Sequence, residues 1–551
     1  MHMRETDMDT MGGYLLQALH REGVRHVFGV PGDYILRWYQ LLSQSNLKHV
    51  GTSREDCAAF AADGYARCHG LGALAVTYGV GALNVVNAVA GANAESSPVV
   101  VISGAPGVAE QRQNPLLHHR FGPFCFQREI FERMTCYAAA LDDPLLARRQ
   151  IDRALELAQL HHKPVYLELP RDLVDAELPP ALSPPTSSAP ISDWDALEEA
   201  VAETLSLLAK AKSAAVLAGS ELHRYQLQDE LTQLVERGAL PVAATLTGKS
   251  VIAERHPAYM GIYEGAMGGA RTRELIERAD VLLLLGATLN DVDLGIFTAK
   301  LDVQHMVQAT ADGVQIHHHR YTGVPLGDYV RALTAGIERS GRSLPVVEPP
   351  LAAIGFPITS QPMTVARLIG RLNDTLPQDM IVVCDTGDCL FASLELRVHA
   401  RTAFLASAFY TTMGFAVPAS LGAQLGSGRR PLVLVGDGAF QMTGTELATA
   451  AWKGLNPIVI VFNNAGYSTE RFILDGPFND IPSWQFHRLG ELFGPLAGFD
   501  VHDEESFDSA WRSALAQTDR PSLLNVHLAP DDPSPAMRRL GEHLGKRVRA
   551  G

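Results

Sequence analysis

Residues 436–464 read GDGAFQMTGTELATAAWKGLNPIVIVFNN, and this segment joins two short apolar runs through a longer stretch of mixed polarity. The run PLVLV ends directly before Gly436, and the run PIVIVF ends directly before Asn463. Short apolar runs without polar alternation predict strands that are covered on both faces. The longer segment between them predicts a helical crossover, and therefore two parallel strands of one α/β sheet.

Polar residues follow both predicted strands. Asp437 lies in the glycine turn after the first strand, and Asn464 follows the second. Because ligands bind doubly wound sheets at the carboxyl ends of parallel strands, both side chains are expected at one binding edge. Glycines there let backbone N–H groups approach a phosphate, and the two side chains offer the oxygen ligands that Mg²⁺ prefers. A lone Gly-Asp-Gly is weak evidence, but the combination predicts a site for Mg²⁺ and a phosphate.

The same alternation of apolar run and helical segment recurs along the chain. Further predicted strands are ALAVTYG, PVVVISG, PVYLELP, AAVLAG, VLLLLGA and MIVVCDTG. Two Pro-rich segments, from Leu178 to Ser192 and from Ser343 to Pro362, are typical of extended linkers. Since 551 residues exceed what one core accommodates, cutting at these segments predicts three α/β domains near 1–178, 193–342 and 361–551.

The composition argues against several classes of protein. The formal net charge of −15 is opposite to the basic face that a nucleic-acid binder needs. No charged residue lies between Arg67 and Glu95, but the glycines, asparagines and threonine of this segment argue against a membrane span. Six scattered cysteines lack disulfide or zinc spacing. We therefore expect a cytoplasmic protein that binds neither nucleic acid nor a membrane.

A second motif, TSREDCAAFAADGYAR at residues 52–67, joins the GDG turn and the Asn-Asn pair in a family resemblance. Along its whole length the chain resembles the thiamine diphosphate enzymes, which include pyruvate decarboxylase, acetolactate synthase and transketolase-like enzymes. The resemblance implies thiamine diphosphate and Mg²⁺ as cofactors, and three doubly wound parallel-sheet domains of the pyruvate decarboxylase type. The middle domain lacks an adenine-dinucleotide fingerprint, so we expect it to hold no cofactor.

The resemblance also implies roles for individual residues. Glu55 would contact N1′ of the aminopyrimidine ring, so that the exocyclic nitrogen becomes the base for the weakly acidic thiazolium C2. Met413 would support the folded cofactor beneath both rings, with the Thr411 carbonyl and the Met413 N–H as backbone partners of the pyrimidine. The other implied ligands of the cofactor are Thr386, Asp388, Asp437, Gly438, Ala439, Asn464 and Gly466. Of these, Asp437, Asn464 and Gly466 would bind the metal.

Two adjacent histidines, His118 and His119, stand in NPLLHHRFG without metal-ligand spacing, and on a strand they would point to opposite faces. By themselves they indicate exposed loop residues. In the 2-keto acid decarboxylase branch, however, a loop ends in two such histidines that reach the active site. Asp33 in VFGVPGDY and Glu470 in NAGYSTERF complete the set of that branch. His, Asp and Glu carry protons at neutral pH, which the release of an aldehyde requires.

The implied substrate pocket differs from that of the pyruvate-specific enzymes. They carry a tryptophan where TGDCLF has Leu390, an isoleucine where Thr469 stands, and a tyrosine that aligns with Val292. Ile473 is expected at the same pocket. Each methylene of a substrate that fills such a pocket contributes roughly 0.8 kcal/mol. The smaller side chains therefore predict a preference for phenylpyruvate, indolepyruvate or branched and long-chain keto acids over pyruvate.

The predicted reaction is non-oxidative decarboxylation of a small 2-keto acid to an aldehyde and CO₂. Two alternatives stay open: a carboligase similar to acetolactate synthase, and an inactive thiamine-fold protein that acts as a regulatory subunit. The adjacent histidines argue against the first, and the intact acids argue against the second. The resemblance further implies a site built between two chains, with a homodimer as the minimal active unit and a homotetramer as the expected assembly.

Overall fold

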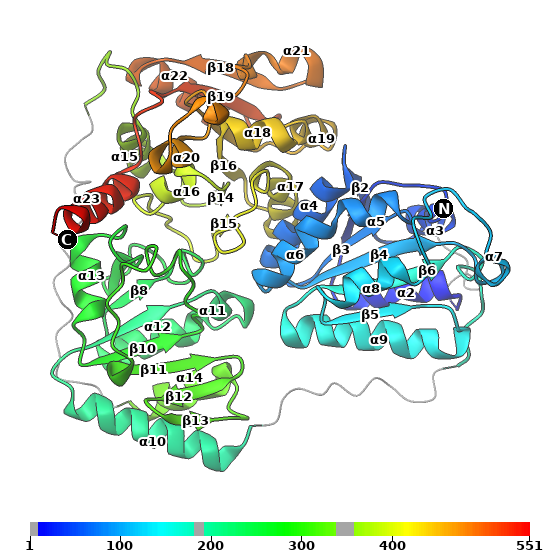
Figure 1. The fold of residues 1–551 in the computed structure, drawn as a ribbon, viewed down its shortest axis with the longest axis horizontal. Helices are drawn as coiled ribbons and strands as arrows, with labels where there is room; N and C mark the ends of the chain where they lie inside the picture. The colour runs from blue at the N-terminus through cyan, green and yellow to red at the C-terminus, as the bar shows by residue number, and fades with distance from the viewer. Residues whose placement is uncertain (1–8, 181–191, 338–356, 551) are drawn as a thin grey trace.

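The computed structural model describes residues 9–180, 192–337 and 357–550. It contains three β-sheets, one in each third of the chain, and each sheet is flanked by helices. The N-terminal domain lies on one side, and the middle and C-terminal domains are stacked on the other (Figure 1). The predicted α/β class with three sheet domains is confirmed. The predicted linkers fall mostly on residues 181–191 and 338–356, outside the described residues, so the domain limits stay predictions.

The N-terminal sheet has six parallel strands in the order β2-β1-β3-β4-β6-β5. The strands are β1 (His26–Gly29), β2 (Lys48–Gly51), β3 (Gly72–Val76), β4 (Val99–Ala105), β5 (Tyr137–Ala140) and β6 (Val165–Pro170). The helices are α2 (Met11–Arg21), α3 (Leu36–Gln44), α4 (Glu55–His69), α5 (Val80–Asn84), α6 (Val86–Ala94), α7 (Val108–Gln113), α8 (Phe126–Glu132) and α9 (Pro144–His161). Strands β3 and β4 are buried along their whole length, as their unbroken apolar runs predict.

The C-terminal sheet repeats this topology with six parallel strands in the order β15-β14-β16-β17-β19-β18. The strands are β14 (Ile381–Cys384), β15 (Phe404–Ala406), β16 (Pro431–Gly436), β17 (Ile458–Asn463), β18 (Ala497–Val501) and β19 (Ser522–His527). The α-helices are α15 (Val365–Thr375), α16 (Asp388–Ala392), α17 (Ala416–Ser427), α18 (Asp437–Thr443), α19 (Glu446–Trp452), α20 (Ser468–Ile473), α21 (Gly490–Phe493), α22 (Glu504–Ala516) and α23 (Pro535–Ala550). Two 3₁₀ helices are η2 (Pro477–Asn479) and η3 (Phe486–Arg488). Strands β16 and β17 pair in parallel, which confirms the crossover predicted from residues 436–464.

The middle sheet departs from the predicted parallel pattern. Its seven strands have the order β13-β12-β11-β10-β7-β8-β9. They are β7 (Ala214–Ala218), β8 (Val242–Ala244), β9 (Tyr259–Ile262), β10 (Val281–Leu285), β11 (Met306–Thr310), β12 (Gly313–Ile316) and β13 (His319–Tyr321). The helices are α10 (Trp194–Lys210), α11 (Glu221–Arg224), α12 (Gln228–Gly238), α13 (Ala270–Glu277), η1 (Val303–His305) and α14 (Leu326–Gly336). Strands β11, β12 and β13 pair antiparallel at one edge. These strands alternate between buried and exposed residues, so a search for continuous apolar runs does not find the hairpin.

Helix α4 of the N-terminal domain packs against α17 of the C-terminal domain, and glycines permit the close contact. A Cβ atom on Gly64 would lie 2.3 Å from the Ala419 carbonyl oxygen. A Cβ atom on Gly422 would lie 1.8 Å from the Ala61 carbonyl oxygen. Both positions therefore require glycine, because the helix backbones touch directly. This contact holds the two outer domains of one chain together.

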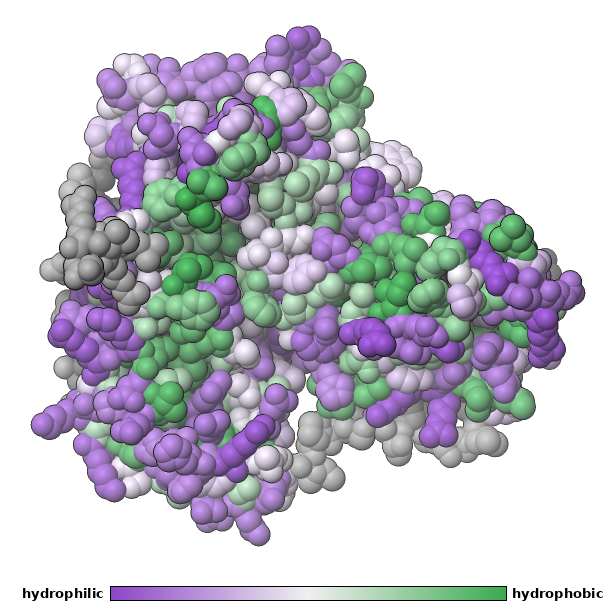
Figure 2. Space-filling model, viewed as in Figure 1, coloured by the Kyte–Doolittle hydropathy of each residue, from purple (hydrophilic) through white to green (hydrophobic). Residues whose placement is uncertain are grey.

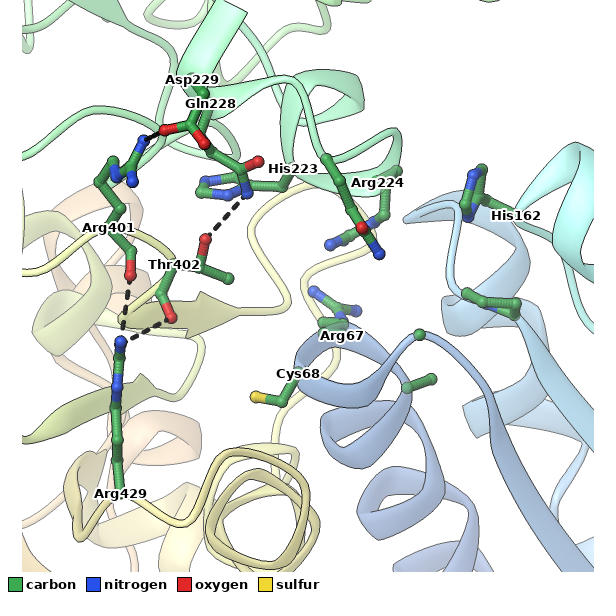
Figure 3. A pocket seen from close by; sticks show the side chains of 14 residues that line it. Arg67, Cys68, His162, His223, Arg224, Gln228, Asp229, Arg401, Thr402 and Arg429 are labelled. Atoms are coloured by element: carbon green, nitrogen blue, oxygen red, sulfur yellow. Dashed lines mark hydrogen bonds and ion pairs between the residues drawn. The ribbon is translucent and has the colours of Figure 1, made fainter. Parts of the chain in front are cut away.

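A cavity of about 550 Å³ lies where the three domains meet. Arg67, Arg224, Arg401 and Arg429 contribute to its wall (Figure 3). Arg67 forms an ion pair with Asp63 at 2.7 Å. Burial and the neighbouring Arg67 lower the pKa of Arg224 to about 10. The domain junction therefore concentrates positive charge in a chain whose net charge is −15.

No helix within residues 9–180, 192–337 and 357–550 combines the length and the apolar character that a bilayer crossing needs. The uncharged segment between Arg67 and Glu95 folds into β3, α5 and α6. The strand predicted from ALAVTYG agrees with β3.

Candidate active site

Two buried oxygen-bearing side chains lie at the carboxyl ends of β16 and β17. Asp437 is 2% exposed, and its carboxylate accepts hydrogen bonds from the N–H groups of Gly438 at 2.8 Å and Gly466 at 3.2 Å. Asn464 is 6% exposed, and its Oδ1 atom has no hydrogen-bond partner among the described residues. A buried oxygen without a donor costs free energy unless a cation binds it. This donor set therefore fits Mg²⁺, which prefers oxygen ligands.

The surroundings of Asp437 also suit a charged ligand. Burial raises the pKa of the Asp437 carboxyl to about 6, so a bound cation would favour the ionised form. A Cβ atom on Gly438 would lie 2.5 Å from the Tyr467 ring, so this position admits only glycine without rearrangement. Ala439 is 1% exposed and packs behind the turn. The glycine therefore leaves the backbone N–H groups of this turn accessible, as a phosphate site requires.

Loop 407–415, which leads into α17, contains the half-buried Met413. The Asp385 carboxylate, fully buried after β14, accepts hydrogen bonds from the N–H groups of Gly414 at 2.9 Å and Ala416 at 2.7 Å. It also accepts one from Thr386 N at 2.9 Å. Burial raises the pKa of Asp385 to about 6. The Asp385 carboxylate therefore links the end of β14 to the loop, and it fixes the backbone next to Met413.

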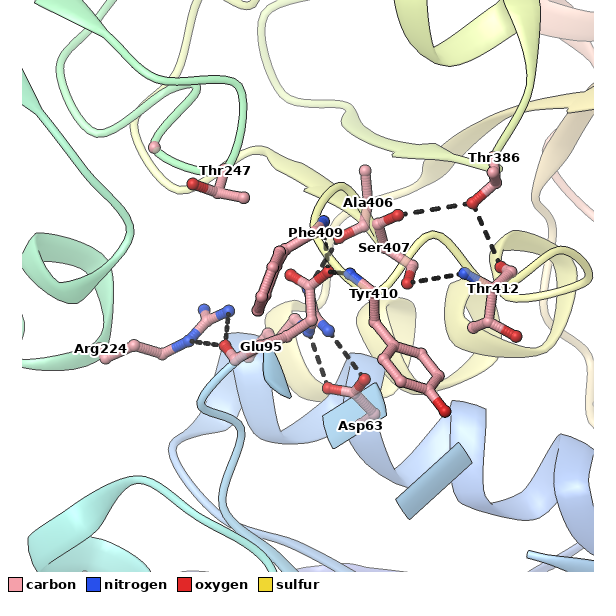
Figure 4. A network of polar contacts seen from close by, with 12 residues as sticks. Asp63, Glu95, Arg224, Thr247, Thr386, Ala406, Ser407, Phe409, Tyr410 and Thr412 are labelled. Atoms are coloured by element: carbon pink, nitrogen blue, oxygen red, sulfur yellow. Dashed lines mark hydrogen bonds and ion pairs between the residues drawn. The ribbon is translucent and has the colours of Figure 1, made fainter. Parts of the chain in front are cut away.

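The N-terminal domain holds the beginning of the same loop through Glu95, which is 7% exposed. Glu95 Oε1 accepts hydrogen bonds from Phe409 N at 2.7 Å and Tyr410 N at 3.0 Å (Figure 4). Arg67 lies 3.5 Å from the other carboxylate oxygen. Thr411, at the exposed tip of the loop, has a φ of +55°. The loop conformation therefore depends on contacts between two domains.

Glu55 is the first residue of α4, at the carboxyl edge of the N-terminal sheet. Asn84 Nδ2 donates a hydrogen bond to Glu55 Oε2 at 2.7 Å. Asn84 closes α5, and the turn before α5 is fixed by a hydrogen bond from Gly79 N to Gln127 Oε1 at 2.7 Å. The orientation of the Glu55 carboxyl is therefore linked to a buried network below it.

That network ends in a buried acid. Gln127 Nε2 donates to the Tyr166 hydroxyl at 2.6 Å, and the Tyr166 hydroxyl donates to Glu168 Oε2 at 2.8 Å. Burial raises the pKa of Glu168 to about 7. A protonated Glu168 carboxyl would add a further O–H donor to this buried hydrogen-bond network.

Asp33 and His118, which the family resemblance assigns to one catalytic set, lie close together in the structure. His118 Nε2 lies 2.8 Å from Asp33 Oδ2, and the Tyr34 hydroxyl donates to the His118 carbonyl at 3.2 Å. The rings of His118 and His119 have centroids 4.8 Å apart. His119 has a φ of +63°, and a Cβ atom on Gly79 would lie 2.4 Å from its carbonyl oxygen. The two histidines thus occupy a tight bend beside an acid, and they do not alternate along a strand.

The other predicted site residues lie in the C-terminal and middle domains. Glu470 and Ile473 are exposed on α20, and Thr469 is half-buried. Leu390 and Val292 are 1% and 8% exposed and belong to one apolar core. In a single chain the structure does not bring these five residues to one open surface. Their role as substrate pocket and proton donor stays a prediction.

Two further predicted cofactor ligands have partners within the C-terminal domain. Asp388 begins α16, and its carboxylate accepts a hydrogen bond from Ser534 N at 2.8 Å. Burial raises the pKa of Asp388 to about 6. The Thr386 hydroxyl donates to the Thr412 carbonyl at 3.3 Å. The first contact joins α16 to the residue before α23, and the second joins the segment after β14 to loop 407–415. The cofactor role of both residues stays a prediction.

The two halves of the site are apart within one chain. Helix α7, which the histidine loop follows, lies at the far side of the N-terminal domain, whereas α20 lies in the C-terminal domain (Figure 1). Segments that are separated in a projection are at least that far apart in space. Helices α7 and α20 are therefore not neighbours in this chain.

Three descriptions of one protein family match the chain. They are the thiamine pyrophosphate enzyme N-terminal TPP binding domain over residues 9–124, the central domain over 201–335 and the C-terminal TPP binding domain over 385–526. The chain belongs to the thiamine pyrophosphate enzyme family. Its relatives are 2-keto acid decarboxylases, and this thiamine pyrophosphate enzyme belongs to the same branch.

The relatives match nearly the whole chain. Identity is 39% with the indole-3-pyruvate decarboxylase of Azospirillum brasilense, over 93% of this chain and 94% of that protein. It is 34% with an alpha-keto-acid decarboxylase of Mycolicibacterium paratuberculosis, over 94% of each. The solved structure of a Rhodococcus jostii thiamine diphosphate-dependent 4-hydroxybenzoylformate decarboxylase has a TM-score of 0.79 and 24% identity, over 94% of this chain and 99% of that one. That structure supports the fold.

The sequence analysis did not select Asp385, Glu95 or Gln127. Asp385 follows the apolar run IVVC directly, and Asp437 follows PLVLV after one glycine, so the same criterion would have found Asp385. Glu95 and Gln127 carry no such signal, because their partners come from distant segments of the chain.

Proposed function

We propose that this 2-keto acid decarboxylase binds Mg²⁺ through Asp437, Asn464 and Gly466, and that it prefers aromatic or branched substrates. The observation that carries the metal assignment is the buried Asn464 Oδ1, which has no hydrogen-bond partner among the described residues and follows the strand next to that of the buried Asp437 carboxylate. The residues proposed to complete the cofactor site are Thr386, Asp388, Thr411, Met413, Gly438 and Ala439. Thiamine diphosphate bound there would supply a nucleophilic carbon and accept the electron pair released with CO₂.

The protein's own groups would orient the cofactor and move protons. Glu55 would hold a proton toward N1′ of the aminopyrimidine ring, and Asn84 would keep the carboxyl in that orientation. The groups proposed to exchange protons with the substrate are Asp33, His118, His119 and Glu470. The Asp33–His118 contact supports this role, because a carboxylate hydrogen-bonded to an imidazole fixes the orientation of the ring.

The substrate range follows from three proposed pocket positions, Leu390, Thr469 and Val292, with Ile473 beside them. The relative from Azospirillum brasilense, an indole-3-pyruvate decarboxylase, supports the choice of an aromatic keto acid. The test compares kcat/KM for pyruvate, phenylpyruvate and indolepyruvate with Mg²⁺ and thiamine diphosphate present. We expect one aldehyde per CO₂ and a higher kcat/KM for the aromatic substrates.

Other outcomes of the same assay identify the alternatives. Formation of acetolactate from pyruvate without free aldehyde would indicate a carboligase. No CO₂ from any keto acid would indicate an inactive regulatory subunit. A clear advantage for pyruvate would overturn the proposed substrate preference.

Leu390→Trp tests the pocket directly. The larger ring should lower kcat/KM for phenylpyruvate relative to pyruvate, because it would occupy the space of the substrate's side chain. Leu390 is fully buried, so a general effect of overpacking must be separated from this one. Leu390→Met, which conserves volume, is the control and should leave the ratio unchanged. If an active Leu390→Trp enzyme keeps the same ratio of kcat/KM for phenylpyruvate and pyruvate, Leu390 does not line the pocket.

The active site is proposed to form between two chains, with the homodimer as the minimal active unit. The separation of the histidine loop from α20 supports this arrangement. Exposed apolar side chains near the histidine loop support it too: Val80 is 56%, Leu116 93% and Phe126 44% exposed. Apolar side chains also gather on the face of the N-terminal domain in Figure 2. Contiguous exposed apolar surface is typical of an interface. A homotetramer in the cytoplasm completes the proposal, and native mass spectrometry tests the assembly.

Complementation tests the shared site. Glu55→Gln and Asp437→Ala chains are each expected to be inactive at limiting Mg²⁺, because they lack different halves of the site. In a mixed dimer one of the two sites would combine an intact Glu55 with an intact Asp437. Unfolding the two variants, mixing them and refolding them together should therefore restore activity. If both residues act within one chain, the mixture stays inactive.

A further inference from the structure

A cluster of three histidines and one aspartate lies at the edge of the C-terminal sheet, where β18 and β19 end. Asp500 belongs to β18, His502 follows β18, His527 closes β19 and His487 lies in η3. None of these residues has a role in the proposed reaction. Their side chains are between 25% and 64% exposed, so solvent reaches the cluster, although the Nδ1 atom of His487 is itself buried.

The three rings converge on one carboxylate. His527 Nε2 lies 2.8 Å and His487 Nδ1 3.1 Å from Asp500 Oδ1, and His502 Nε2 lies 3.1 Å from Oδ2. The rings of His502 and His527 stack with centroids 4.2 Å apart. The ligand atoms of Asp500, His502 and His527 all lie within 4.8 Å of one another. Ligands around a tetrahedral Zn²⁺ with bonds of about 2.1 Å are roughly 3.4 Å apart, so rotation of exposed side chains suffices to reach that geometry.

A buried amide orients the carboxylate. Asn525 is 1% exposed, and its Nδ2 atom donates to Asp500 Oδ1 at 2.8 Å. Its Oδ1 atom accepts a hydrogen bond from Asn463 Nδ2 at 2.9 Å, which ties the amide to the neighbouring strand β17. Outer partners of this kind fix the ligands in protein metal sites.

A comparison with the Asp33 cluster shows why charge favours the Asp500 cluster. Both contain an aspartate and two histidines within reach of one another. Beside Asp33, however, the Arg171 guanidinium lies 3.9 Å from the carboxylate, and this fixed positive charge opposes a metal ion. Among the described residues, Asp500 forms ion pairs with histidines alone. A histidine loses its charge when it binds a metal, so no fixed cation remains.

We propose that Asp500, His502 and His527 bind a divalent transition-metal ion of the Zn²⁺ class, with His487 as the fourth ligand. Imidazole-rich sites suit Zn²⁺, Cu²⁺ and Ni²⁺, whereas the oxygen donors beside Asp437 suit Mg²⁺. The ion would join β18, β19 and η3, and would therefore stabilise the edge of the sheet without taking part in the reaction.

The test uses Co²⁺ as a spectroscopic probe on the full chain, saturated with Mg²⁺ and thiamine diphosphate. A tetrahedral site gives intense visible absorption bands, and we expect one Co²⁺ per chain with such bands, displaced by Zn²⁺. His502→Gln should abolish the bands and weaken Co²⁺ binding by more than about 10-fold, since loss of even an outer partner costs about that much. His502 is the most exposed ligand, so this variant should keep its fold and its kcat.

A matched control addresses the adjacent histidines in the turn between β12 and β13. His317→Gln combined with His318→Gln removes one half-buried and one exposed imidazole elsewhere and should leave the Co²⁺ bands unchanged. The proposal is overturned if the unaltered protein shows no tetrahedral bands. It is equally overturned if the bands persist in His502→Gln combined with His527→Gln, or disappear in the control.

Discussion

The N-terminal and C-terminal sheets share one strand order but differ in the residues that follow their strands. Each has six parallel strands in corresponding positions. In the C-terminal domain Asp437 and Asn464 are 2% and 6% exposed, whereas the side chains of Asp33 and His118 are 43% and 58% exposed. A buried carboxylate beside an unpartnered oxygen favours a resident cation. An exposed acid–histidine pair can instead exchange protons with a ligand. The same fold therefore presents different side chains in its two outer domains, and function depends on these side chains and not on the fold.

Removing the proposed activator from the N-terminal half should have the largest effect. Glu55→Gln keeps the shape of the side chain but cannot hold the same proton, so we expect kcat to fall about 10²–10⁴-fold. Hydrogen exchange at C2 of the bound cofactor, followed by NMR, should slow in parallel, while cofactor affinity stays near that of the unaltered enzyme. Asp56→Asn, at the next position of α4, is the control and should exchange normally. Unaltered exchange in Glu55→Gln would remove its assigned role.

The reciprocal change addresses the C-terminal half. Asp437→Ala removes the buried carboxylate, so we expect cofactor affinity at low Mg²⁺ to fall about 10–100-fold, as loss of a charged contact does. High Mg²⁺ should restore part of the affinity. Calorimetric titration of cofactor measures both, and Asp475→Ala, an exposed acid after α20, is the control. Equal affinity in Asp437→Ala and in the control would contradict the metal assignment.

A smaller effect is expected where one domain positions the other. Glu95→Ala removes the acceptor of Phe409 N and Tyr410 N, and a hydrogen bond to a charged group contributes about 1.5–3 kcal/mol. The Met413 loop should loosen, and the cofactor concentration at half-maximal activity should rise, with kcat changed less. Glu95→Gln retains an acceptor oxygen and should restore most of the affinity. If both variants behave alike, the hydrogen bonds to the loop are not what positions it.

The smallest effect concerns the buried acid beneath the N-terminal edge. The pKa of Glu168 is raised to about 7 by burial, above the value of roughly 4.3 in an unfolded chain. Between these values the folded chain keeps a proton that the unfolded chain releases, so stability falls as pH rises toward 7. Glu168→Gln stays neutral and should flatten the decline of Tm between about pH 5 and pH 7. Parallel pH profiles of the two proteins would show that Glu168 is ionised in the folded state.

The buried strands and the residues directly after them were predictable, whereas contacts from other segments were not. Runs such as PLVLV and PIVIVF predicted β16 and β17, because a strand covered on both faces has no polar alternation. The hairpin of β12 and β13 was missed because one of its faces is exposed and its turn contains His317 and His318. Glu95 was missed because its structural role is to bind the backbone of Phe409 and Tyr410, which are far away in the sequence.

The sequence by itself determined the three sheets, the family and the placement of Asp437 and Asn464 at the ends of two neighbouring strands, because these depend on local periodicity and on short motifs at strand ends. The tertiary structure alone decided that Asn464 Oδ1 is buried with no partner within the described part of the chain, and that Asp33 lies 2.8 Å from His118. It also decided that Glu95 holds a loop of another domain, and that Asp500 gathers three histidines. The reason is physical: burial, hydrogen bonding and electrostatic contact arise between segments that the chain brings together only when it folds.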